Sequence, residues 1–123
     1  MAKTILIVED EKTLFEALSV KLEEAGYKIV EAKDGKEGLE IALKIKPDLL
    51  LVDILMPIMD GITMINKLKE DEWGKNVPMI ILTNFSDEEK MRQAELAGVH
   101  DYMVKSDWKL SDLVDKVNEK LKG

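Results

Sequence analysis

Five short apolar runs, separated by stretches with helical spacing, constrain the fold of this chain most strongly. The runs are Ile5 to Val8, Lys28 to Ala32, Leu49 to Val52, Met79 to Leu82 and Tyr102 to Val104. Most of them lack polar alternation, which is typical of strands that are covered on both faces. Strands that alternate with helices five times predict an α/β domain with one doubly wound, five-stranded parallel sheet and five helices.

The segments between the runs carry the signals of helices and of their ends. Leu14, Leu18 and Leu22 repeat every four residues, and the glycine that follows, Gly26, accepts the geometry of a helix C-terminus. Pro47 stops the helix before the third run. The stripe in the helix before the last run is the weakest, with Met91, Ala94 and Ala97. We therefore expect that helix to bury least and to move most readily.

Length and charge limit the classes of function. The 123 residues predict a single domain over 1–123. A net charge of −7 disfavours direct binding to nucleic acid or to an anionic membrane. The chain has no cysteine, and its first apolar run is too short for a signal peptide or a spanning helix. We expect a cytoplasmic protein.

Polar residues gather where the predicted strands end. They are Glu9, Asp10, Asp53, Thr83 and Lys105. Ligands of open parallel sheets bind at the carboxyl ends of the strands. Each residue alone has a structural explanation, such as serving a helix N-terminus or lying in solvent. Together, three carboxylates repel one another unless a cation lies among them, and oxygen ligands suit Mg²⁺. A carboxylate beside that cation can act as a nucleophile toward phosphorus.

The whole chain resembles the response-regulator receiver domains of two-component signalling. The matching features are the acidic pair Glu9 and Asp10, then Asp53 with Pro57 four residues later, "MDG" at 59–61, Thr83 and Lys105. The resemblance implies a flavodoxin-like strand order, 2-1-3-4-5. It also implies that Asp53 accepts a phosphoryl group from the phosphohistidine of a histidine kinase or phosphotransfer protein. Such a domain takes part in its own phosphorylation and slow dephosphorylation without being an enzyme in the usual sense.

The resemblance also implies roles for the surrounding residues. Asp10, Asp53 and the backbone carbonyl of Leu55 would bind Mg²⁺ directly, and Glu9 would act mostly through water. Thr83 would move to the phosphoryl group, Lys105 would contact it, and Tyr102 would turn inward. The face made by the last two helices and the strand between them would then bind an unknown target protein, and the chain would be a monomer or a dimer through that face.

Two departures from the family pattern affect the site. Ser106 stands where the family has proline, and a cis bond before a non-proline residue costs about 2.5–4 kcal/mol, so we predict a trans Lys105–Ser106 peptide. Leu55 and Phe85 flank the site, and an apolar pair there should hinder an attacking water. These two residues predict a long-lived phosphoryl group.

Three other functions compete with this interpretation. Aspartate-dependent phosphatases carry a second Asp two residues after the nucleophile, where this chain has Leu55. A flavodoxin-like cofactor carrier needs an anion-binding loop after the first strand, and "EDEK" at 9–12 would repel a phosphate. A receiver-like scaffold that is never phosphorylated stays open. Only two residues follow Leu121, which is compatible with a stand-alone regulator and with a piece trimmed from a larger one.

Overall fold

Strands and helices alternate strictly along the chain in the computed structural model, which describes residues 2–83, 88–105 and 109–121. The strands are β1 (Thr4–Val8), β2 (Lys28–Ala32), β3 (Leu49–Asp53), β4 (Met79–Thr83) and β5 (Tyr102–Val104). The helices are α1 (Lys12–Glu24), α2 (Gly35–Ile45), α3 (Gly61–Leu68), α4 (Glu88–Leu96) and α5 (Leu110–Leu121). The predicted α/β class and its five strands and five helices are confirmed.

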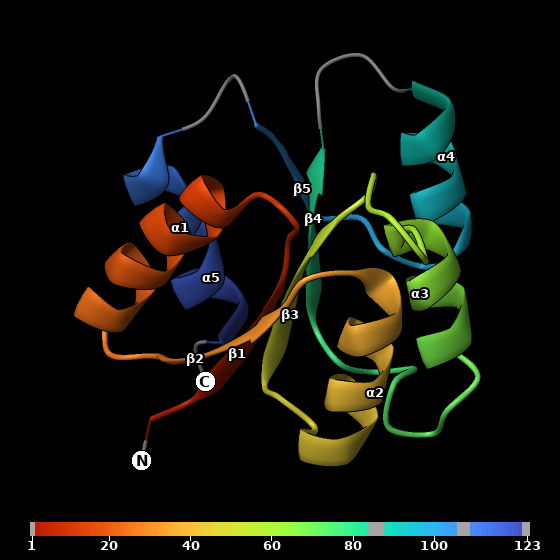
Figure 1. Ribbon diagram of the computed structural model, residues 1–123, viewed down its shortest axis with the longest axis horizontal. Helices are drawn as coiled ribbons and strands as arrows, with labels where there is room; N and C mark the ends of the chain where they lie inside the picture. Colours follow the sequence, from red (N-terminus) through yellow and green to blue (C-terminus); the bar gives the residue numbers. More distant parts are fainter. Residues whose placement is uncertain (1, 84–87, 106–108, 122–123) are drawn as a thin grey trace.

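The strands form one parallel sheet in the order β2-β1-β3-β4-β5. Helices α1 and α5 cover one face, and α2, α3 and α4 cover the other (Figure 1). The fold is therefore doubly wound and flavodoxin-like, as predicted. The order reverses between β1 and β3, so a crevice is expected outside the carboxyl ends of these two strands. None of the described helices is long and apolar enough to cross a membrane.

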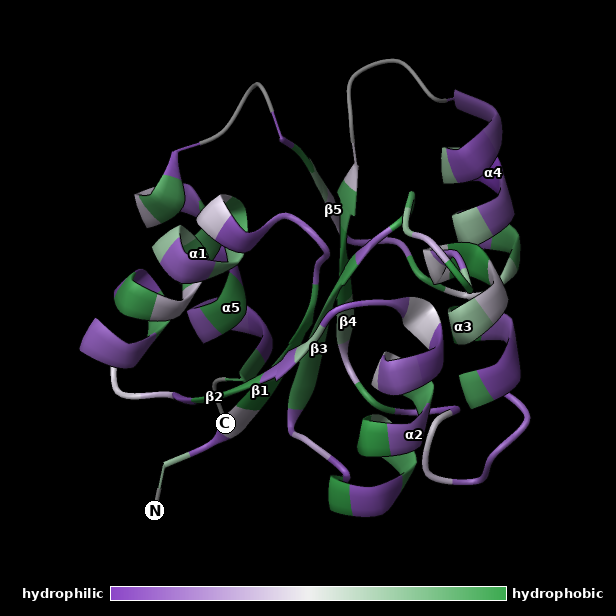
Figure 2. Cartoon of the chain, in the orientation of Figure 1, coloured by the Kyte–Doolittle hydropathy of each residue, from purple (hydrophilic) through white to green (hydrophobic). Residues whose placement is uncertain are grey.

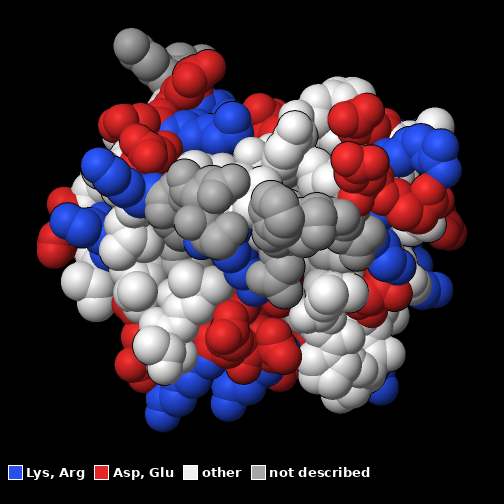
Figure 3. Space-filling view, turned by 90° about the horizontal axis from the view of Figure 1, so that it is seen from above, with Lys and Arg blue, Asp and Glu red and all other residues white. Residues whose placement is uncertain are grey.

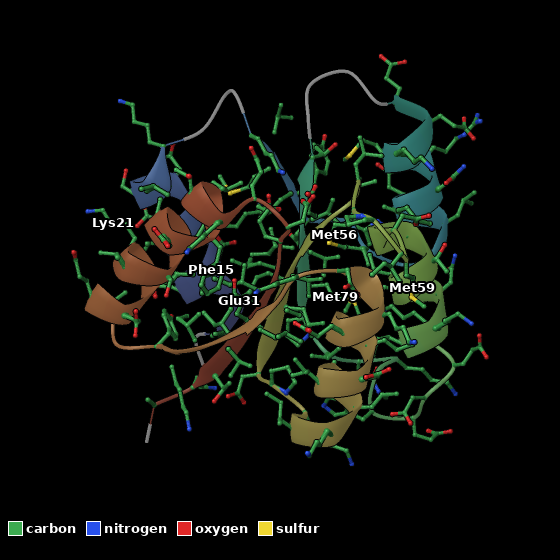
Figure 4. All side chains as sticks on the ribbon, viewed as in Figure 1. Phe15, Lys21, Glu31, Met56, Met59 and Met79 are labelled. Carbon is green, nitrogen blue, oxygen red and sulfur yellow. The ribbon has the colours of Figure 1, made fainter. Side chains whose placement is uncertain are left out.

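Side chains alternate along the strands and build a separate core on each face. Leu50 and Val52 pack toward α2, α3 and α4, whereas Leu49 and Leu51 pack toward α1 and α5. Figure 2 shows the apolar sides of the helices turned toward the sheet. Met79 belongs to the first core, Met56 and Met59 pack against it, and Phe15 packs against the second core; Figure 4 labels these four side chains. Burial on both faces explains why the strands read as continuous apolar runs.

The ends of the elements lie close to their predicted positions. Gly26 follows α1 with φ +98°, which favours glycine. Strand β3 continues through Asp53 and β4 through Thr83, one residue beyond the predicted apolar runs. Both polar residues are thus fixed by sheet hydrogen bonding, a more rigid position than a loop after the strand would give.

Helix α4 has the fewest buried residues of the helices described. Ala94 is its single buried residue among those described, and Met91 packs partly against the first core. By comparison, α3 buries Ile62, Met64 and Ile65. The weak stripe predicted for this helix is confirmed, and the expectation that it moves most readily stays a prediction.

Candidate functional site

The register of the sheet brings the ends of four strands to one edge. Val8 lies opposite Val52, and Asp53 lies opposite Leu82. Thr83 lies opposite Val104, and the amide of Lys105 donates to the carbonyl of Thr83 at 2.7 Å. The residues at or just beyond these ends therefore share one face of the molecule, which Figure 3 views from above; acidic and basic side chains lie close together on it.

The turn after β3 fixes where Asp53 points. The amide of Gly61 donates to the carbonyl of Ile54 at 2.8 Å. A Cβ at Gly61 would lie 2.3 Å from the carbonyl oxygen of Asp53, which is too close for any other residue. Asp60 starts α3 by accepting the amide hydrogen of Thr63 at 2.8 Å. Asp60 and Gly61 therefore place the start of α3 directly against the end of the strand that carries Asp53.

Three carboxyl groups converge on this edge. Oxygens of Glu9, Asp10 and Asp53 lie within 4.8 Å of one another. Glu9 is 1% exposed and Asp53 is 3% exposed, whereas Asp10 is exposed. Two buried acids beside a third are unfavourable as charged groups without a cation or a proton. The predicted acidic cluster is thus present, with one member open to solvent.

Lys105 extends into the cluster from beyond β5. Its Nζ lies 3.1 Å from Oε1 of Glu9 and 3.1 Å from Oδ2 of Asp53. A third carboxylate, Glu11, is 3.7 Å away. The side chain of Lys105 is largely buried, so these pairs are screened less by solvent than surface pairs are. Lys105 provides the positive charge that this group of acids requires.

Burial and mutual repulsion shift the pKa values of these groups. Burial raises the pKa of Glu9 to about 8, helped by the charge of Asp53 and by a hydrogen bond between the two carboxyl groups. Burial also raises the pKa of Asp53, against the hydrogen bond from Glu9 and the charge of Lys105. Burial lowers the pKa of Lys105, but the charges of Asp53 and Glu9 outweigh this and leave it raised. The crowding of buried acids thus raises the pKa of Glu9, and Lys105, which donates to both of its carboxylate oxygens, acts against that shift.

The donor set fits a hard divalent cation. It consists of carboxylate oxygens, one of them on an exposed residue, so that water can complete the coordination as Mg²⁺ prefers. The raised pKa of Glu9 reflects the crowding of buried acids, and a bound cation would relieve that crowding. The same edge holds the buried carboxylate of Asp53, a lysine and the hydroxyl of Thr83, an arrangement compatible with phosphoryl transfer.

The remaining predicted residues are placed as follows. Thr83 is 2% exposed at the end of β4. The side chain of Tyr102 is on the outside, 46% exposed, two strand positions before Val104. Leu55 is 51% exposed at the rim of the site. Phe85 and Ser106, together with the predicted trans bond before Ser106, lie outside the described residues. Their predicted effects stay predictions.

Sequence reasoning missed two contributors to the site. Glu11 pairs with Lys105 across 94 residues of sequence, and its signal was a third acid in the "EDEK" segment. Ile58 adopts φ +69° in the turn after β3, where the amide of Met59 donates to the carbonyl of Pro57 at 2.7 Å. No sequence signal marks this conformation, because a β-branched residue is the type least expected at positive φ.

Comparison with known proteins agrees with the fold. Residues 5–118 match the response regulator receiver domain family. The chain is 38% identical over 105 residues to the phosphate regulon transcriptional regulatory protein PhoB of Pseudomonas aeruginosa, covering 85% of this chain and 46% of that protein. It is 38% identical to the chemotaxis protein CheY of Halobacterium salinarum over 105 residues, which cover 85% of this chain and 86% of that protein.

A solved structure provides a further comparison. The receiver domain of a sensor histidine kinase from Pseudomonas aeruginosa PAO1, solved with a magnesium ion coordinated in its active-site cleft, superposes with a TM-score of 0.90 at 25% identity over the full length of both chains. This chain therefore belongs to the receiver domains of two-component response regulators. It spans less than half of the length of several curated relatives, PhoB among them.

Proposed function

We propose that this chain is a phosphorylation-dependent switch in which Asp53 is the phosphoacceptor. The observation that carries the proposal is the convergence of Glu9, Asp10 and Asp53, with the Nζ of Lys105 at 3.1 Å from Asp53. The phosphoryl donor is a phosphohistidine on a histidine kinase or on a phosphotransfer protein. The switch acts in the cytoplasm, with residues 1–123 as one domain.

The transfer forms one bond and breaks one bond. An Oδ of the Asp53 carboxylate attacks phosphorus while the phosphorus–nitrogen bond of the phosphohistidine breaks. The bonding electron pair leaves with the imidazole nitrogen, and the product is an aspartyl phosphate. Strand β3 holds the attacking carboxylate in the sheet, so little conformational freedom has to be lost to reach the reactive geometry.

The acidic cluster would hold Mg²⁺. Asp10, Asp53 and the backbone carbonyl of Leu55 are proposed as its protein ligands, with Glu9 acting through water. Bound Mg²⁺ would neutralise charge on the phosphoryl oxygens. Support comes from the oxygen donor set and from the magnesium ion coordinated in the related receiver domain.

Thr83 and Lys105 would bind the phosphoryl group once it is attached. Lys105 already contacts Asp53, so a short movement of its ammonium would follow the added charge. Thr83 would hydrogen-bond the phosphoryl group, and Tyr102 would turn from its exposed position toward the space behind Thr83. The weakly buried α4 would then shift with β5 and α5, and the altered face would bind a downstream protein or a second copy of the chain.

Intact mass measurement tests the chemistry. The chain is incubated with acetyl phosphate and Mg²⁺, and the proposal predicts the addition of one phosphoryl group. Asp53→Ala should abolish the addition, whereas Asp48→Ala, at an acid outside the site, should leave it unchanged. An unmodified wild-type chain that still binds Mg²⁺ would instead favour a scaffold that works without phosphorylation.

A long lifetime of the phosphoryl group is the second part of the proposal. Leu55 at the rim of the site is apolar, and together with Phe85 it would keep water from the line of attack. Replacing Leu55 by Ser should shorten the lifetime several-fold, followed as the decay of the phosphorylated mass after acetyl phosphate is removed. An unchanged or longer lifetime in Leu55→Ser would contradict this role of the side chain.

A further inference from the structure

A pocket opens at the edge of the sheet opposite Asp53. It lies between the segment that leads into β4 and the turn from α4 into β5, and its volume is about 310 Å³. Because both strands are parallel to β3, their amino ends lie at the edge away from the acidic cluster. The pocket thus shares no residue with the site described above.

The lining of this pocket is basic, although the chain as a whole carries a net charge of −7. Lys69, Lys75 and Lys120 contribute three ammonium groups. Asp101 is the single acid among the described residues that line it, which leaves a formal charge of +2. Three separate parts of the chain, namely the end of α3, the turn before β4 and the end of α5, bring these lysines together.

The existing contacts of these lysines leave donors for a ligand. Lys69 Nζ donates to the backbone carbonyl of Lys75 at 3.1 Å and has no carboxylate within 4.0 Å among the described residues. Lys75 pairs at 3.4 Å with Glu72, which is almost fully exposed. Lys120 pairs with Asp101. Each ammonium has three hydrogens, so one contact does not exhaust it.

An amide, an imidazole and two valines complete the pocket. Asn76 and His100 line it and form no side-chain hydrogen bond within the parts of the chain that the structure describes. Val77 and Val99 are buried and form its apolar wall. The lining is therefore more polar than that of a typical drug-like pocket, which suits a charged ligand better than a hydrophobic one.

We propose that this pocket binds a small molecule through its phosphate group. Several ammonium groups that converge from different elements suit an anion with more than one charge and several acceptor oxygens. The volume suits a small phosphorylated compound, and the acidic remainder of the surface disfavours a nucleic-acid strand. This proposal is independent of the phosphorylation of Asp53, because it uses a different edge of the sheet.

The test is a titration of the ¹⁵N-labelled chain with inorganic pyrophosphate, without Mg²⁺ and at constant ionic strength. The proposal predicts saturable shifts of the amide signals of Gly98, Val99 and His100, and no shift at Asp10 or Asp53. Inorganic phosphate and sulfate are titrated in the same way. The difference in affinity between pyrophosphate and phosphate measures the contribution of the second phosphate, and the affinity for sulfate measures binding that any oxyanion would show.

Three variants identify the residues responsible. Lys75→Gln should weaken binding about tenfold, since its present partner is exposed and the fold does not depend on it. Asp101→Asn should tighten binding by removing the acid from the lining. Lys67→Gln is the matched control, because Lys67 is exposed on α3 and does not line the pocket.

Other results would overturn the proposal. Shifts that never saturate, or that appear at Asp10 and Asp53, would mean that pyrophosphate acts elsewhere. Equal weakening in Lys67→Gln and Lys75→Gln would mean that only the overall charge matters. An unchanged thermal midpoint of Lys75→Gln establishes that lost binding in this variant is not lost folding.

Discussion

At the end of β3, Asp53 faces the ammonium of Lys105 at 3.1 Å while four buried apolar residues precede it along the strand. The apolar residues hold the backbone in place, and the lysine makes the buried charge tolerable. Breaking such a buried pair by removing one partner leaves an uncompensated charge. The apolar strand and the lysine together therefore explain how an acid is held in this buried position.

Glu9 gives a prediction at the scale of one residue. Its pKa is raised from 4.5 to about 8, so protonation stabilises the metal-free fold fully below pH 4.5, and this contribution is lost as pH rises through 8. The charged groups that face it are Asp53, Asp10 and Lys105. Glu9→Gln mimics the protonated form, so in EDTA this variant should gain stability relative to the wild type as pH rises from 6 to 8.5.

Urea unfolding at the two pH values measures this effect. Glu16→Gln, at an exposed glutamate of α1, is the control and should show no such gain. If the difference between Glu9→Gln and the wild type did not change with pH, Glu9 would not hold the proton, and the account of the metal-free cluster would be wrong.

Ile58 gives a second prediction at this scale. It is the centre of the three-residue turn after β3, with φ +69°, and its side chain is 77% exposed. Positive φ costs a residue with a Cβ about 1–2 kcal/mol, and glycine avoids that cost. Glycine also loses more conformational entropy on folding than alanine, which offsets part of this gain. Ile58→Gly should therefore have a free energy of unfolding about 0.5–1 kcal/mol higher than that of Ile58→Ala. Equal stability of the two variants in urea would mean that the turn is not strained.

At the scale of elements, the start of β5 is tied to α5 by ion pairs. Asp101 pairs with Lys120 and, at 3.7 Å, with Lys116. Burial acts to raise the pKa of Asp101, but the two lysines outweigh it and lower that pKa. Through this acid, α5 is held against the sheet edge at which the basic pocket opens.

Asp101→Asn should reduce the free energy of unfolding by about 1 kcal/mol at pH 7. Folding lowers the pKa of Asp101 from 3.8, so its ion pairs stabilise the fold fully above pH 3.8. This stabilisation is lost as the pH falls through the lower pKa that Asp101 has in the folded state. Lys69, Lys75, Lys116, Lys120 and His100 are the titratable groups around it. Chemical unfolding between pH 3 and pH 7 measures the effect.

Asp115→Asn makes the same charge change on an exposed position of α5 that forms no ion pair among the described residues. It should be close to the wild type throughout. A loss of stability in Asp101→Asn that persisted undiminished at pH 3 would show that packing, and not the ion pairs, accounts for it.

The sequence predicted elements better than it predicted contacts between them. Continuous apolar runs and regular helical stripes depend on nearby residues, so the five strands and the weak stripe of α4 were correctly predicted. The pairing of Lys105 with Glu11 joins distant positions, and only the sheet register brings them together. The close approach of Gly61 to the carbonyl of Asp53 depends in the same way on how α3 meets β3.

At the scale of the whole molecule, two polar sites lie at opposite ends of the strands of the doubly wound sheet. The carboxyl edge carries the acidic cluster, and the amino edge of β4 and β5 carries the basic pocket. Two apolar cores, one on each face, make the sheet between them rigid. The family, the fold and the clustered acids together support one central claim, that Asp53 carries the phosphoryl group.

Locating the phosphoryl group on the chain tests that claim most directly. The chain is phosphorylated with acetyl phosphate, the acyl phosphate is reduced with borohydride, and the modified residue is identified by peptide mass mapping. The account predicts modification at Asp53, present with Mg²⁺ and absent with EDTA. Modification at Asp10 or another acid, or modification that does not require the metal, would contradict it.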